Sequence, residues 1–148
     1  MRVTGFLSLL AALLAVLILT GSCIAPPEMP EIEEVSIMRI VIGDHEFQAV
    51  LEDNPTAEAL RERLPLELTM SELNGNEKYN YLDFDLPADS FSPGQIQAGD
   101  IMLYGSSCLV VFYESFSTPY SYTRIGRIED ATDLRAAVGS GSVQMQFE

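Results

Sequence analysis

From residue 35 onward, apolar and polar residues alternate in short stretches, with the period of two that is typical of half-buried β-strands. The first stretch places Met38, Ile40 and Ile42 on one face of a strand. The turn-forming pair Gly43-Asp44 follows, and alternation resumes over residues 47–51. Two alternating runs joined by such a short turn predict a β-hairpin.

Further short strands are predicted along the rest of the chain, at residues 66–70, 79–84, 95–96, 100–104, 108–113 and 143–147. The segment 108–113, with sequence CLVVFY, is apolar at every position. A strand that is apolar on both faces is typical of a central strand covered on both sides. Its cysteine, Cys108, is expected to be a small buried residue.

Two short helices interrupt the strands. Asn54 is a favourable N-cap, Pro55 suits the first helical turn, and Pro65 cannot continue a helix. These residues predict a helix over 54–64. A second helix is expected within 130–138, with Gly139 as its C-terminal cap.

The sequence therefore predicts a mainly β protein, with about seven or eight short strands and two short helices. Many short strands at close spacing favour a small closed or nearly closed β-barrel. Closure leaves no unpaired edge strand, and edge strands promote aggregation.

The N-terminal residues carry a different pattern. Residues 6–19 are almost entirely apolar, which is shorter than the roughly 18–20 residues that a membrane-spanning helix needs. Small residues and Cys23 follow, a pattern similar to that of a bacterial lipoprotein signal, in which the chain is cut before the cysteine and the thiol carries lipid. An ordinary signal peptide with an incidental cysteine, or an uncleaved anchor, are the alternatives. We expect a signal peptide over 1–22, a tether over 23–34 rich in proline and glutamate, and one domain over 35–148.

Lipidation of Cys23 would determine where the protein works. Two acyl chains hold a protein on a membrane, because each buried CH₂ contributes roughly 0.8 kcal/mol. The expected location is therefore membrane-anchored and extracytoplasmic, in a bacterial cell envelope, with the membrane itself as a partner.

Charge and composition exclude several kinds of function. The chain has 8 Lys+Arg against 22 Asp+Glu, a net charge of −14, which argues against a nucleic-acid partner. A single histidine and two cysteines exclude most His/Cys metal sites. Asp83, Asp85 and Asp89 lack the spacing of a calcium loop. We expect no metal and no cofactor.

The candidate ligand-binding residues lie at the end of the apolar segment 108–113 and directly after it. They are Tyr113, Phe116, Tyr120, Tyr122 and Arg124. Aromatic rings offer flat apolar area, and the arginine offers donors for carbonyl oxygens, so the group could hold an extended peptide or a proline ring. The alternative is structural: the rings cap the barrel end, and the arginine pairs with a carboxylate.

Four segments together resemble the bacterial cyclophilin-like fold proteins: IVIGDHEFQAVLEDNPTAEAL, LPLELTMSELNGNEKYNYL, GDIMLYGSSCLVVFYESF and YSYTRIGRI. The resemblance covers roughly residues 37–147. It implies a closed barrel of about eight strands with short flanking helices. The Phe-His-Arg signature of the catalytic cyclophilins is absent, as is tryptophan, and the only histidine, His45, lies beside the predicted hairpin turn. No catalytic residue is therefore carried over.

The expected function is a membrane-tethered, extracytoplasmic binding module for a peptide, a protein or a small ligand. A weak peptidyl-prolyl cis/trans isomerase that assists folding in the envelope is the alternative, with Arg124 as its candidate catalytic group. A structural lipoprotein that contacts envelope partners through its acidic surface is a third reading.

Overall fold

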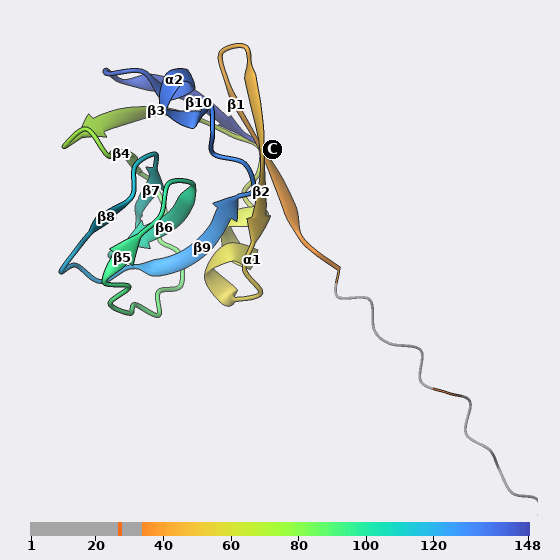
Figure 1. The fold of residues 1–148 in the computed structure, drawn as a ribbon. Helices are drawn as coiled ribbons and strands as arrows, with labels where there is room; N and C mark the ends of the chain where they lie inside the picture. The colour runs from red at the N-terminus through yellow and green to blue at the C-terminus, as the bar shows by residue number, and fades with distance from the viewer. Residues whose placement is uncertain (1–26, 28–33) are drawn as a thin grey trace, which may run out of the picture. The chain divides into compact units, whose positions relative to one another are not determined.

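The computed structural model describes Pro27 and residues 34–148 (Figure 1). The expected signal peptide and Cys23 lie outside the described residues. The described part contains ten strands and two helices: β1 (Ile37–Ile42), β2 (His45–Leu51), α1 (Pro55–Arg61), β3 (Leu66–Leu73), β4 (Glu77–Tyr81), β5 (Gln95–Ile96), β6 (Asp100–Tyr104), β7 (Cys108–Phe112), β8 (Phe116–Ser117), β9 (Thr123–Ile128), α2 (Leu134–Val138) and β10 (Val143–Phe147).

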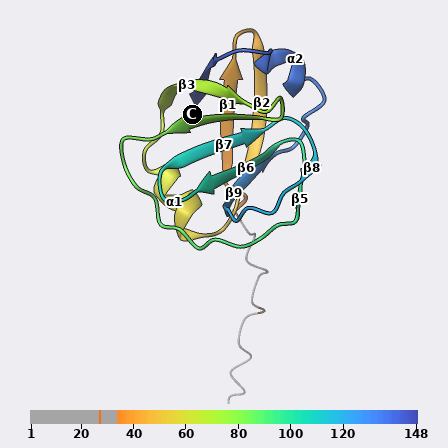
Figure 2. The same cartoon turned by 90° about the vertical axis from the view of Figure 1, so that its left-hand side faces the viewer.

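Eight of the strands close into an antiparallel barrel in the order β1-β10-β3-β4-β7-β6-β9-β2. The remaining two, β5 and β8, form a separate two-stranded sheet, which lies beside β6 and β7 in Figure 2. The predicted mainly β, closed barrel of about eight strands with two helices is confirmed. In none of the described helices is there an apolar stretch long enough to cross a membrane.

Local sequence explains the first elements. Gly43, at φ +58°, turns the β1–β2 hairpin, as predicted. The side chain of Asn54 accepts a hydrogen bond from the Ala57 amide at 2.8 Å, and this cap begins α1. The helix ends at Arg61, earlier than the predicted residue 64.

The second helix is also shorter than its predicted range of 130–138. It begins at Leu134, because the amide of Thr132 bonds to the side chain of Asp130 in a turn before it. Gly139 caps its C-terminus at φ +61°, as predicted.

The apolar residues form two clusters on opposite faces of the barrel wall. The larger fills the barrel interior and includes Met38, Leu60 and Phe147, all fully buried. The smaller lies on the outer face of β6 and β7 and consists of Ile96, Met102, Cys108, Val110, Phe112 and Tyr122, with Tyr79 and Phe116 packed against it. All five residues of β7 are buried, which confirms the prediction that this strand is covered on both sides.

Candidate binding groove

A groove lies over the outer cluster, between β4 and the segment that runs from β8 toward β9. It has a volume of about 500 Å³. We call it the tyrosine groove, and its lining residues are Leu73, Asn74, Asn76, Glu77, Tyr79, Tyr81, Tyr104, Cys108, Val110, Phe116, Ser117, Thr118, Pro119, Tyr120 and Tyr122. A concave, mainly apolar surface with a few polar groups is the usual form of a ligand site.

Residues of β7 form the floor. The side chains of Cys108, Val110 and Phe112 point outward, because alternate residues of a strand face the same side. The Phe112 ring packs edge-on against Tyr122, with ring centroids 5.4 Å apart, and at a tilt against Phe116, with centroids 5.7 Å apart. Burial raises the pKa of the Cys108 thiol to about 11, so this cysteine is neutral and acts as a small apolar residue.

Exposed tyrosines form the rim. Tyr81, Tyr104 and Tyr120 are 66%, 44% and 58% exposed. Tyr104 and Tyr120 lie nearly perpendicular, with ring centroids 6.2 Å apart. Large aromatic side chains that gather on an exposed concave surface mark an interaction site more often than scattered ones do.

One charged side chain lies in this apolar setting. Glu77 begins β4, lines the groove and is only 9% exposed. Burial, and to a smaller extent the nearby charge of Glu72, raise its pKa to about 7. The groove therefore contains a carboxyl group that changes charge near neutral pH.

The structure brings together three of the five residues that the sequence predicted for the ligand site. Phe116, Tyr120 and Tyr122 line the tyrosine groove. Tyr113 packs against the interior cluster, and its hydroxyl donates to both carboxylate oxygens of Glu72, at 2.7 and 2.9 Å. Arg124 lines a different hollow.

Contacts outside the tyrosine groove hold Arg124. Its guanidinium lies over the Phe91 ring, 5.1 Å from the centroid. Its Nη1 is 4.0 Å from Oδ1 of the buried Asp100. These contacts agree with the structural alternative for Arg124, in which the arginine pairs with a carboxylate.

Sequence reasoning missed the opposite wall of the groove. Glu77, Tyr79 and Tyr81 occupy alternate positions of β4, and Tyr104 ends β6. The alternation in the segment EKYNY is visible in the sequence, and it places these three side chains on one face. What the sequence does not show is that β4 and β6 both pair with β7.

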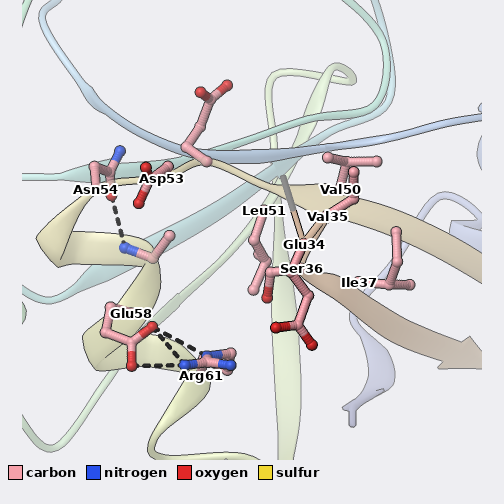
Figure 3. Close-up of a pocket in the computed structure, with 12 residues that line it drawn as sticks. Glu34, Val35, Ser36, Ile37, Val50, Leu51, Asp53, Asn54, Glu58 and Arg61 are labelled. Atoms are coloured by element: carbon pink, nitrogen blue, oxygen red, sulfur yellow. Dashed lines mark hydrogen bonds and ion pairs between the residues drawn. The ribbon is translucent and has the colours of Figure 1, made fainter. Parts of the chain in front are cut away.

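A second hollow, of about 720 Å³, lies between α1 and the start of β1 (Figure 3). Its lining includes Glu34, Glu52 and Asp53, and Glu58 pairs with Arg61 at 2.7 Å across one turn of α1. Within residues 34–148, no three His, Cys, Asp or Glu side chains are placed to hold a metal ion. The lining of this hollow is mainly polar, whereas ligand sites are usually mainly apolar, so the tyrosine groove is the stronger candidate for a ligand site.

In a comparison with protein families, residues 40–148 match the cyclophilin-like family. No curated protein matches the chain. Since the match covers most of the chain and the matched residues form the expected closed barrel, the protein belongs to the cyclophilin-like family.

Proposed function

We propose that this protein is a binding module that takes an extended peptide segment of a partner in the tyrosine groove. The observation that supports it is the concentration of exposed aromatic side chains there. Of the large apolar side chains that are exposed among residues 34–148, four line this groove: Leu73, Tyr81, Tyr104 and Tyr120. A peptide that covered them would remove apolar surface from water at roughly 25 cal/mol per Å².

The module works at a membrane surface outside the cytoplasm, held by lipid on Cys23. The support comes from the sequence, where apolar residues 6–19 precede small residues and that cysteine. The mass of the chain purified from bacterial membranes tests this part. Cleavage before Cys23 with a diacylglyceryl adduct is the expected result, and a Cys23→Ala chain should lose the adduct. An intact N-terminus, or a mature chain without lipid, would contradict the anchor.

An isomerase receives less support from the geometry. Its candidate catalytic group, Arg124, is held by Phe91 and Asp100 in a separate hollow. Cis/trans exchange of an Xaa-Pro peptide, followed by NMR with and without the protein, tests this alternative. Enhanced exchange that is lost in Arg124→Ala would favour the isomerase over a pure binding module.

The binding proposal is tested by NMR titration of the full chain in detergent with capped tripeptides Ac-Gly-Xaa-Gly-NH₂, in which Xaa is leucine, norleucine, phenylalanine, proline, glutamate or lysine. We expect at least one of them to shift the ring resonances of Tyr104 and Tyr120. Tyr104→Ala and Tyr120→Ala should weaken that binding. Phe91→Ala removes an exposed ring outside the groove and should not. If none of the peptides shifts these resonances, the proposal fails.

A further inference from the structure

Glu77 is the only charged residue among those described as lining the tyrosine groove. Nine-tenths of it is buried, yet its carboxylate makes no hydrogen bond or ion pair with residues 34–148. Buried carboxylates are normally paired, and an unpaired one costs several kcal/mol of desolvation. A partner that is missing from the protein can be supplied by a ligand.

The neighbouring residue adds a second unpaired acceptor. The side-chain oxygen of Asn76 is buried and accepts no hydrogen bond within the described chain, and Asn76 also lines the groove. Two adjacent acceptors without donors suit a ligand that brings several N–H groups. They do not suit an anion.

The aromatic walls fit the same ligand. The rings of Tyr79 and Tyr81 on one wall meet at 82°, with centroids 6.0 Å apart. On the other wall, Tyr104 and Tyr120 meet at 86°. Rings at right angles present both faces and edges to the groove, and the face of an aromatic ring attracts a cation within about 6 Å.

We propose that the groove recognises a basic side chain, lysine or arginine, of the bound peptide: its alkyl stem lies along the tyrosine rings and its cationic head pairs with Glu77. This inference rests on the proposed binding function and names the chemistry of its ligand. A peptide is the occupant, because the exposed rings of Tyr81, Tyr104 and Tyr120 extend the apolar surface to the rim. A free amine would leave that surface in water.

The groups around Glu77 determine how recognition varies with pH. Cys108 on β7 and the tyrosines of the groove share its face of the barrel wall, and Glu72 on β3 lies nearby on the face of Lys78. The pKa of Glu72 is lowered by its hydrogen bonds to Lys78 and Tyr113, which outweigh the opposing effect of its burial. Burial raises the pKa of Tyr122. Glu77 is thus the group near the site that gains charge as the pH rises through neutrality, and a cation should bind better above that range.

The test compares Ac-Gly-Lys-Gly-NH₂ with its uncharged counterpart, Ac-Gly-Nle-Gly-NH₂, by NMR titration of the full chain in detergent. At pH 8, we expect the lysine peptide to bind at least tenfold more tightly. Glu77→Gln should reduce that ratio to near one. Glu67→Gln, which removes an exposed carboxylate on β3, should leave the ratio unchanged.

Each other result has a definite meaning. If both peptides bind equally well to the unaltered protein, the inference is wrong and the binding module stands. If neither binds and the other tripeptides also fail, the proposed function itself is wrong. If butylammonium binds as tightly as the lysine peptide, the occupant is a free amine and our choice of a peptide is overturned.

A second measurement covers the case in which Glu77→Gln does not fold. The lysine peptide is titrated into the unaltered protein at pH 5.5 and pH 8. A drop in affinity of at least fivefold at the lower pH, with no change for the norleucine peptide, supports the inference. Equal lysine affinity at both values would overturn it.

Discussion

Glu77 and Lys78 are consecutive residues of β4, and both are buried, but the strand turns them to opposite faces of the barrel wall. Lys78 is the only lysine of the chain and is completely buried. Its ammonium group donates to Oε2 of Glu72 at 2.5 Å and to the carbonyl oxygens of Gly139 and Gly141, at 3.0 and 2.5 Å. Every donor of this ammonium therefore has an acceptor.

The two neighbours show what distinguishes a structural charge from a candidate functional one. Lys78 joins β4 to β3 and to the loop between α2 and β10, so its partners come from within the fold. Glu77 faces the tyrosine groove and has no such partner among the described residues. Burial alone does not separate the two roles, since both residues are at least nine-tenths buried. The presence or absence of a partner does separate them.

The same contrast holds for the apolar clusters on the two faces. In the interior, Phe147→Ala should lower the free energy of unfolding by about 4 kcal/mol, because a fully buried ring is lost and a cavity remains. Phe116→Ala, in the partly buried wall of the groove, should lower it by only about 1–2 kcal/mol. Urea denaturation of the two variants measures both values. Equal losses would mean that the outer cluster is as structural as the interior.

Lys78→Met should be the next largest loss, about 3 kcal/mol, because it removes the cation paired with Glu72 and the donor to two buried carbonyl oxygens. Its matched control is Arg61→Met, which breaks an exposed pair with Glu58 on α1 and should leave the urea midpoint nearly unchanged. If Lys78→Met unfolds no more easily than the control, the distinction between a paired and an unpaired buried charge loses its basis.

For Glu77, the expected effect is of similar size but depends on pH. Its pKa is raised from 4.5 to about 7 in the folded protein. Below both pKa values, the folded and unfolded chains both hold the proton, so this carboxyl group does not change the free energy of unfolding. As pH rises from about 4.5 to 7, the unfolded chain releases the proton while the folded chain keeps it, and the free energy of unfolding falls by about 3 kcal/mol.

Glu77→Gln isolates this effect. The variant carries no titrating group at this position, so the difference in unfolding free energy between the variant and the unaltered protein should grow across that pH range and then level off. Urea denaturation at several pH values measures it. A difference that stays constant with pH would show that the pKa of Glu77 is not raised, and would weaken the view of this carboxyl as an unpaired group.

The sequence predicted the barrel well because most of its strands carry their own pattern. The alternation of Met38, Ile40 and Ile42 and the turn at Gly43 determine the first hairpin locally. It did not predict β9, in which Gly126 interrupts the apolar pattern. A Cβ on Gly126 would lie 2.4 Å from the Val50 carbonyl oxygen, so this glycine is required by the close approach of β2 and not by any turn.

The tyrosine groove was predicted only in part, for the same physical reason. Phe116, Tyr120 and Tyr122 are near one another in the chain, so the sequence alone could predict that they lie together. Tyr104 joins them only through strand pairing with β7, which no local pattern encodes. The side chain of Tyr113 packs in the barrel interior, because that of Phe112, one position earlier, points outward.

The smallest effect on stability is expected at the rim of the groove. A substitution there tests most directly whether the groove binds a ligand. Tyr120 is 58% exposed, so Tyr120→Ala should change the free energy of unfolding by less than about 0.5 kcal/mol. Tyr122 lies two residues further on but is only 4% exposed and packs on Phe112, so Tyr122→Ala should cost about 3 kcal/mol.

Urea denaturation gives both numbers, and titration with the lysine peptide gives the affinity of Tyr120→Ala. A Tyr120→Ala chain that keeps its stability but loses affinity places this ring in recognition, because the fold is then equally stable without it. A Tyr120→Ala chain that is as destabilised as Tyr122→Ala would instead make the rim a part of the core, and the groove would then be a consequence of packing.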